Sequence, residues 1–197
     1  MDSFIEREIA RAVGILAAGG VVCYPTETFY GLAADALAPD AVARVVAMKR
    51  RGAGAPIATI VPDLVAAGRL WETCPESLRA LATRYWPGPL TIVAPALAYV
   101  PAPLVGEWGV GARVSSHPVA QALARAFGGP ITATSANRAG LPPAETTFAA
   151  RAQLGEAVEL YLDDGPAPGG APSTVVTIVS GSPRILRVGA ISIDFSA

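Results

Sequence analysis

Hydrophobic positions recur along this chain at two periods, one typical of helices and one typical of buried strands. Near its start, apolar side chains follow the helical spacing at Ile5, Ile9, Val13 and Leu16. This spacing predicts a helix over Phe4 to Leu16, with Ser3 as its N-cap and Gly19-Gly20 as its stop. The apolar run Val21 to Tyr24 then predicts a buried strand, which Pro25 ends.

The same two periods continue through the rest of the chain. Further helices are predicted over Ala41 to Met48, with Asp40 as the cap, and over Pro75 to Tyr85, Pro118 to Phe127 and Thr147 to Leu154. Further strands are predicted over Ile57 to Val61, Leu90 to Ala94, Val110 to Val114, Ile131 to Thr134, Glu159 to Leu162 and Thr174 to Val179. This interleaving favours an α/β or α+β fold with a mixed twisted sheet flanked by helices.

One segment lacks any hydrophobic period. Residues Asp163 to Pro172, DDGPAPGGAP, are dense in Gly and Pro and predict a loop that could act as a flap. No repeat or composition shift divides the 197 residues, so we expect one domain over 1–197.

Composition narrows the class of protein. Hydrophobic residues make up 52% and charged residues 16%, which excludes a disordered chain. No apolar run reaches the roughly 18 residues of a membrane span, and the N-terminus does not resemble a signal peptide, so we expect a cytoplasmic protein without a membrane segment. Cys23 and Cys74 are far apart and His117 is the only histidine, which disfavours a zinc centre or a Ser-His-Asp triad.

The basic residues are distributed in an unusual way. Of the 15 Lys and Arg residues, Lys49 is the only lysine. A chain that otherwise uses arginine wherever a positive charge is needed retains an ammonium group at this one position. Lys49 is therefore a candidate for a role that arginine cannot fill.

Polar residues form short clusters where predicted strands end: Thr26 to Thr28, Lys49 to Arg51, Arg113 to His117, Ser135 to Asn137, Ser173-Thr174 and Arg187. If loops at strand ends bring these clusters together, they form one cationic cavity. Cations beside hydroxyl and amide groups suit a ligand with several anionic oxygens, such as a nucleoside triphosphate. Neither a P-loop nor a Rossmann fingerprint occurs in the chain.

Each cluster also has a purely structural interpretation. The bases Lys49-Arg50-Arg51 would complement the negative end of a helix dipole, and the tripeptide Ser135 to Asn137 would form a capped turn. His117 precedes Pro118 and would cap a helix, while Trp86 to Pro89 would form a rigid turn. No single cluster separates the two interpretations.

Taken in order, the clusters resemble a known family. The motifs are YPTETFYGLAADA from Tyr24, the Lys-x-Arg at Lys49, WPGPLT from Trp86, ARVSSHP from Ala112, TSAN from Thr134, STVV from Ser173 and ILRVG from Ile185. Together they resemble the YrdC-like family of threonylcarbamoyl-AMP synthases, from about Val21 to Gly189. The resemblance implies an α/β fold with a large cationic cavity.

The resemblance also assigns residues. It implies that the catalytic set is Lys49, Arg51, Ser135 and Asn137. It implies that the substrates are bound by Thr26, Tyr30, Arg113, Ser173 and Arg187, with the threonine beside Thr26 and Tyr30. The chain departs from the common family pattern at Phe29, Ala33, Ile60 and Thr177, and we expect these departures to affect the threonine pocket more than the phosphate site. Longer members carry a C-terminal domain that we do not expect in a chain of this length.

The implied activity is that of a nucleotidyltransferase. It would convert L-threonine, bicarbonate and ATP, with Mg²⁺ held largely by phosphates and water, to threonylcarbamoyl-AMP and pyrophosphate for tRNA modification. Its partners would include the proteins that transfer the threonylcarbamoyl group. The alternatives are carbamoyl-adenylate chemistry for another acceptor, or a module that binds double-stranded RNA or tRNA. The pI of about 5.8 leaves room for only a weak RNA contact.

Overall fold

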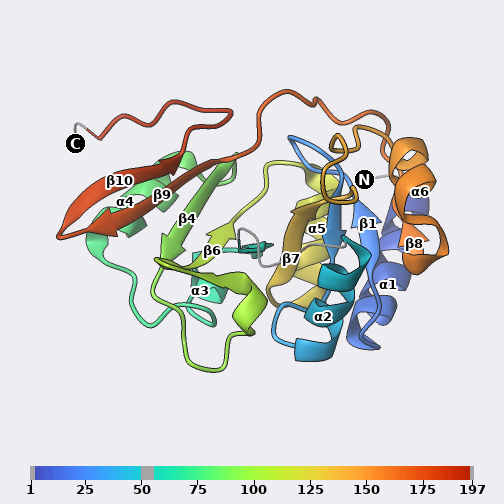
Figure 1. Ribbon diagram of the computed structural model, residues 1–197, viewed down its shortest axis with the longest axis horizontal. Coiled ribbons are helices and arrows are strands. Elements are labelled where there is room, and N and C mark those ends of the chain that lie inside the picture. The colour runs from blue at the N-terminus through green and yellow to red at the C-terminus, as the bar shows by residue number, and fades with distance from the viewer. Residues whose placement is uncertain (1–2, 50–55, 196–197) are drawn as a thin grey trace.

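The computed structural model describes residues 3–49 and 56–195 (Figure 1). Its helices are α1 (Ser3–Ala17), α2 (Pro39–Met48), α3 (Leu64–Ala67), α4 (Glu76–Tyr85), α5 (Pro118–Phe127) and α6 (Thr147–Leu154), with 3₁₀ turns η1 (Ala102–Leu104) and η2 (Gly155–Ala157). Its strands are β1 (Val22–Tyr24), β2 (Gly31–Ala33), β3 (Ala58–Ile60), β4 (Leu90–Ala94), β5 (Val105–Gly106), β6 (Gly109–Arg113), β7 (Ile131–Ser135), β8 (Leu160–Tyr161), β9 (Thr174–Val179) and β10 (Ser182–Arg187).

The ten described strands form one mixed sheet in the order β10-β9-β4-β6-β3-β7-β2-β1-β8, with β5 paired to β6. The pairs β3·β6, β4·β9 and β1·β8 are parallel, and the others are antiparallel. This confirms the expected mixed sheet flanked by helices. Because neighbouring strands run in both directions, polar residues from strand starts and strand ends can face one cavity.

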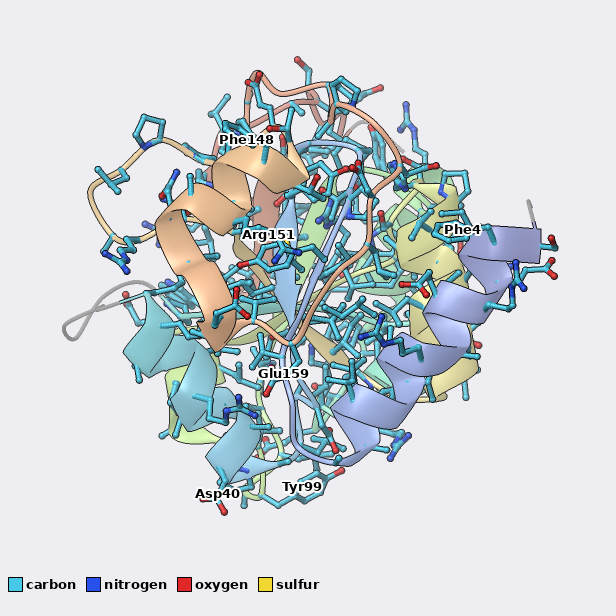
Figure 2. The ribbon with its side chains drawn as sticks, turned by 90° about the vertical axis from the view of Figure 1, so that its right-hand side faces the viewer. Phe4, Asp40, Tyr99, Phe148, Arg151 and Glu159 are labelled. Atoms are coloured by element: carbon cyan, nitrogen blue, oxygen red, sulfur yellow. The ribbon has the colours of Figure 1, made fainter. Side chains whose placement is uncertain are left out.

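Both faces of the sheet are covered, as the alternation within β1 shows. Cys23 belongs to the core cluster that includes residues of α2, α4 and α6, whereas its neighbours Val22 and Tyr24 belong to the cluster that includes residues of α1 and α5. Figure 2 looks onto the end of the molecule where α1 and α6 lie. Leu16 of α1 and Leu123 of α5 are fully buried in this second cluster, as the helical spacing requires.

Several boundaries differ from the expectations. The N-cap of α2 is Ala38, so Asp40 lies in the first turn of the helix. There its negative charge still interacts favourably with the positive end of the helix dipole. Ser3 is the first residue of α1 rather than its cap. Strands β2, β5 and β10 and helix α3 were not expected. Strands β2 and β5 and helix α3 are short, and β10 is largely exposed and carries two arginines, so it does not match the pattern of a buried strand.

None of the helices in the described ranges combines the length and the apolar character that crossing a bilayer requires.

Candidate active site

A cavity of about 370 Å³ spreads over the middle of the sheet. Small residues of three strands, Gly31, Ala58 and Ala133, lie along its floor and leave the space open. The cavity is lined by all eight predicted site residues that the structure describes: Thr26, Tyr30, Lys49, Arg113, Ser135, Asn137, Ser173 and Arg187. Arg51, the ninth, lies outside the described residues.

Lys49 joins the end of α2 to the end of β7. Its side chain is buried, and Nζ donates to the Ser135 carbonyl at 2.5 Å and to the carbonyl and Oδ1 of Asn137, both at 3.0 Å. The residue occupies the C-cap position of α2, as the dipole interpretation required. Its ammonium, however, also donates to oxygens of the Ser135–Asn137 turn, so the same charge stabilises that turn at the cavity wall.

The turn itself is held from within by Asn137. The amide Nδ2 donates to the carbonyls of Arg138, at 3.0 Å, and Leu141, at 2.6 Å, while Oδ1 accepts from Ser135 Oγ at 2.5 Å. The interpretation as a capped turn therefore holds geometrically. The same contacts fix the hydroxyl of Ser135 next to the ammonium of Lys49, which gives the cavity a rigid polar corner.

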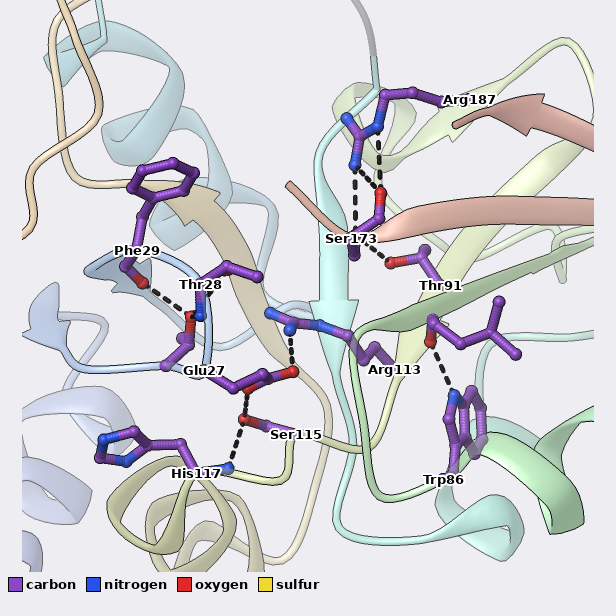
Figure 3. Close-up of polar contacts among 12 residues, drawn as sticks. Glu27, Thr28, Phe29, Trp86, Thr91, Arg113, Ser115, His117, Ser173 and Arg187 are labelled. Carbon is purple, nitrogen blue, oxygen red and sulfur yellow. Dashed lines mark hydrogen bonds and ion pairs between the residues drawn. The ribbon is translucent and has the colours of Figure 1, made fainter. Parts of the chain in front are cut away.

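A second polar group lies where β4, β9 and β10 meet (Figure 3). Arg187 donates from Nη2 to the carbonyl of Ser173 at 2.8 Å and to its Oγ at 3.1 Å. Ser173 Oγ in turn is 2.8 Å from Thr91 Oγ1. Burial lowers the pKa of Arg187, and the nearby charge of Arg113 lowers it further. The two guanidinium groups are therefore close enough to repel each other.

Arg113 is held by a carboxylate that the sequence motifs did not single out. Its Nη1 donates to Glu27 Oε1, and Ser115 Oγ donates to Glu27 Oε2 (Figure 3). Ser115 Oγ also accepts from the backbone N–H of His117 at 3.2 Å. The available signal was one acidic residue, Glu27, within a polar turn otherwise made of threonines.

His117 caps α5, as its structural interpretation predicted. Its Nδ1 accepts from the N–H of Val119 at 3.3 Å, and its Nε2 lies 3.7 Å from Asp164 Oδ2. Burial lowers the pKa of His117, while the charges of Asp164 and Glu27 oppose that shift.

Thr26 and Tyr30, which are expected to lie beside threonine, donate their hydroxyl groups to backbone carbonyls of the protein. Thr26 Oγ1 donates to the carbonyl of Phe29 at 2.7 Å, which shapes the turn. Tyr30 donates to the carbonyl of Gly165 at 2.6 Å, and burial raises its pKa to about 12. A further bond joins Gly169 N–H to the carbonyl of Thr28 at 2.8 Å. The loop 163–172 has no helix or strand, as predicted, but these bonds attach it to the cavity wall.

The four departures from the family pattern lie in different surroundings. Phe29 lines the cavity, whereas Ala33 and Ile60 are buried in the core beside α1 and α5. Thr177 is also buried, and its Oγ1 donates to the carbonyl of Val93 at 2.9 Å. Of the four, Phe29 lines the cavity directly, and the expectation that the departures affect the threonine pocket more than the phosphate site stays a prediction.

The motif WPGPLT forms a turn before β4, as its structural interpretation predicted. Trp86 Nε1 donates to the carbonyl of Leu90 at 2.7 Å across a cis Trp86–Pro87 bond, and Gly88 N–H donates to the carbonyl of Val114 at 2.8 Å. This turn places Thr91, which sequence reasoning missed as a site residue, beside Ser173.

The fold and the cavity together define a class of protein. It is an α/β domain on a mixed sheet, whose cavity gathers Lys49, Arg113 and Arg187 with hydroxyl groups. Such a set matches a ligand that carries several anionic oxygens.

Comparison with known proteins identifies the family. The model of the Sua5/YciO/YrdC family, described as telomere recombination, matches residues 14–189, so this chain belongs to that family. The resemblance seen in the motifs is thereby confirmed.

Individual relatives agree with this family. A protein of Mycobacterium tuberculosis is 38% identical over 196 residues, which are 96% of this chain and 87% of its own. The threonylcarbamoyl-AMP synthase of Alkalilimnicola ehrlichii is 42% identical over 85% of this chain and 89% of its own. The crystal structure of Pyrococcus abyssi Sua5 complexed with L-threonine superposes with a TM-score of 0.88 at 34% identity. That match covers 93% of this chain and 54% of the longer protein.

Proposed function

We propose that this protein is a threonylcarbamoyl-AMP synthase, a nucleotidyltransferase that acts on L-threonine, bicarbonate and ATP. The observation that carries the proposal is the arrangement of the cavity. It unites Lys49 and the Ser135–Asn137 turn with Arg113 and Arg187, in a chain whose relatives bear this enzyme name. The match to a structure that holds L-threonine supports the choice of amino acid.

The reaction requires two bond-forming steps in one cavity. The amine nitrogen of threonine bonds to the carbon of CO₂, which bicarbonate supplies, and loses a proton. One oxygen of the resulting carbamate attacks the α-phosphorus of ATP. The bond from that phosphorus to the bridging oxygen breaks, and pyrophosphate leaves with the electron pair.

The protein's task in this chemistry is to hold anions together. Carbamate and ATP repel each other, and more charge develops on the phosphoryl oxygens as the new bond forms. Fixed cations and hydroxyl donors lower the activation free energy of this step because they need no rearrangement during the reaction. We assign this role to Lys49, Ser135 and Asn137 on one side of the cavity, and to Arg113, Ser173 and Arg187 on the other. Arg51 belongs to the same proposal.

The cavity offers little to hold a metal ion by itself. Among the residues that the structure describes, no group of three or more His, Cys, Asp or Glu side chains is placed to hold one. We therefore assign Mg²⁺ to the phosphates of ATP and to water, in keeping with its preference for phosphate oxygens. There it would neutralise charge on the leaving pyrophosphate.

The product, a mixed anhydride, must be passed to an acceptor. On this proposal, the acceptor is an adenosine of tRNA that becomes N6-threonylcarbamoyladenosine, and separate transfer proteins carry out that step in the cytoplasm.

The test is pyrophosphate release from ATP in the presence of bicarbonate and Mg²⁺, with mass spectrometry of the product. We expect release to require both threonine and bicarbonate, and to yield threonylcarbamoyl-AMP. Arg187→Gln should lower the rate by about 100-fold or more, as expected when a preorganised donor is lost. Arg125→Gln, on the outer side of α5, serves as the control and should leave the rate unchanged. Pyrophosphate release that is independent of threonine would contradict the proposal.

A further inference from the structure

The cavity lining contains cations but no carboxylate among its described members. Lys49, Arg113 and Arg187 face the same space, and Arg113 already lowers the pKa of Arg187. Like charges held this close cost free energy until an anion enters, so each side chain tends to turn away from the others. A counter-charge behind the wall can offset this cost.

Glu27 is placed to supply that counter-charge. It does not line the cavity but contacts Arg113 from behind, where the side chains are 13% and 8% exposed, respectively. One carboxylate oxygen accepts from Arg113 and the other from Ser115, whose Oγ is tied to the start of α5. Both oxygens are thus fixed, and the carboxylate cannot rotate freely.

This arrangement also divides the donors of Arg113. A guanidinium carries five N–H groups in one plane. Within the described part of the chain, its hydrogen bonds to the protein are made by Nη1, to Glu27. Holding one edge of the group fixes the plane of the other edge, which is left for oxygens of a ligand in the cavity.

We propose that Glu27 is a positioning residue that sets the orientation of Arg113 toward the phosphoryl group of the substrate. Glu27 does not touch substrate. It acts by holding the guanidinium in one rotamer and by offsetting the repulsion within the empty cavity. This assignment rests on the proposed synthase function, since the phosphoryl group in question is that of ATP.

Two measurements separate positioning from a purely structural role. In Glu27→Gln the amide retains the shape of the side chain but loses its charge, so Arg113 is less firmly oriented and its positive charge is no longer offset. We expect kcat to fall by about tenfold or more, because misplaced catalytic groups are costly. We expect pyrophosphate, measured by calorimetry, to bind about threefold more tightly, because an attractive charge on the cavity is no longer offset. A loss of folded structure alone would lower both kcat and the affinity for pyrophosphate.

A double-mutant cycle tests whether Glu27 acts through Arg113. In an Arg113→Gln background, Glu27→Gln should lower kcat no further, because the group that it orients is gone, whereas pyrophosphate should still bind more tightly because the negative charge is lost. Ser115→Ala, which frees one carboxylate oxygen but keeps the charge of Glu27, should lower kcat by less than Glu27→Gln and leave pyrophosphate affinity nearly unchanged, and it tests the proposal independently if Glu27→Gln does not fold. Glu159→Gln is the matched control, since Glu159 pairs with Arg44 away from the cavity.

The outcomes are distinct. An unchanged kcat, weaker pyrophosphate binding, or full additivity with Arg113→Gln in kcat would overturn the role of Glu27. Absence of threonine-dependent turnover in the parent protein would instead overturn the synthase proposal, and pyrophosphate binding by Glu27→Gln would still decide whether Glu27 offsets the positive charge of the cavity.

Discussion

Lys49 shows how a residue can serve structure and chemistry through the same contacts. Three oxygen atoms of Ser135 and Asn137 lie within 3.0 Å of its ammonium, which is buried. A planar guanidinium is larger and presents its donors in a fixed fork, so it cannot reproduce this compact arrangement. The structure therefore gives a physical reason for the single lysine in a chain rich in arginine.

We expect Lys49→Arg to slow threonine-dependent pyrophosphate release. The loss should correspond to about 2 to 4 kcal/mol of transition-state stabilisation. The buried oxygens of the Ser135–Asn137 turn would also lose their donor, so the free energy of unfolding should fall by about 1 to 3 kcal/mol. Activity is to be measured well below the melting temperature, with circular dichroism as the check on folding. Activity within a few-fold of the parent would leave Lys49 with a structural role alone.

His117 provides a second prediction at this scale, because it is the only histidine. Burial holds its pKa below the ordinary value near 6.5 despite the charge of Asp164. The unfolded chain then binds the proton more readily, so the stability of the folded state falls as pH drops below about 6.5 and levels off below the folded pKa.

The measurement is the free energy of unfolding from pH 7.5 to 5, compared with that of His117→Asn, in which asparagine retains an N-cap. We expect the fall to be smaller in the variant. The single imidazole resonance should titrate below 6.5 in the folded protein. Titration above that value would contradict the assignment.

Residues to which the family resemblance assigns a role could be predicted from the sequence, whereas motif residues that act through a distant partner could not. The eight described site residues were named because the resemblance assigns each of them a role, and all eight line one cavity. Glu27 and Thr91 were missed because their significance depends on Arg113 and Ser173, which lie 86 and 82 positions away in the chain. No local pattern carries such pairings.

At the scale of elements, the loop 163–172 is attached to the cavity rather than free. Its backbone accepts from the hydroxyl of Tyr30 and donates to Thr28 and Glu145 through Gly169 and Ala167. Because Pro172 at its end lines the cavity, the position of the loop and the shape of the site are linked.

Tyr30→Phe should release this loop. We expect a loss of about 0.5 to 1.5 kcal/mol of stability, the usual value of one hydrogen bond. We also expect faster hydrogen exchange at Gly165 and Gly169 and a several-fold higher KM for threonine. Tyr161→Phe is the matched control, because Tyr161 also donates to a glycine carbonyl, at 2.7 Å, but lies outside the cavity. If both variants change KM equally, the loop does not shape the site.

The predicted elements were most accurate where the hydrophobic period was sustained. The bounds of α5, α6, β4 and β9 match the expectation, since each combines a clear period with a definite cap or break. Strand β2 has three residues, too few to establish any period, and its pairing with β1 and β7 is a property of the assembled sheet.

At the scale of the molecule, the net charge is −1, and three of the cations, Lys49, Arg113 and Arg187, face the cavity. Arg113 and Lys49 are buried and are poorly placed to contact a nucleic-acid backbone. A protein that neutralises few phosphates binds nucleic acid weakly and releases it as salt rises.

We therefore expect tRNA binding, in a filter assay at about 50 mM salt, to be weak and to be lost by about 200 mM. The control is the same assay with double-stranded DNA, which should behave alike. Tight tRNA binding that survives the higher salt would instead favour an RNA-binding module.

The strand order was not predictable from the sequence, although the class of fold was. Alternating helices and strands indicate a layered α/β molecule, but they do not say that β4 pairs with β9 or that β3 lies between β6 and β7. Those pairings depend on tertiary packing, and they decide which motifs meet.

The long separations across the cavity have a consequence for biogenesis. The contacts Lys49–Ser135, Thr91–Ser173 and Glu27–Arg113 span 86, 82 and 86 positions. The chain loses conformational entropy in closing such long loops before the contacts between their ends can form. Proteins rich in these long-range pairings therefore fold slowly, on a scale of milliseconds to seconds. On a ribosome, a nascent chain that already displays Lys49 and Arg113 still lacks Arg187. It acquires a complete cavity, and hence the ability to retain nucleotide, only once β10 has emerged and added to the edge of the sheet.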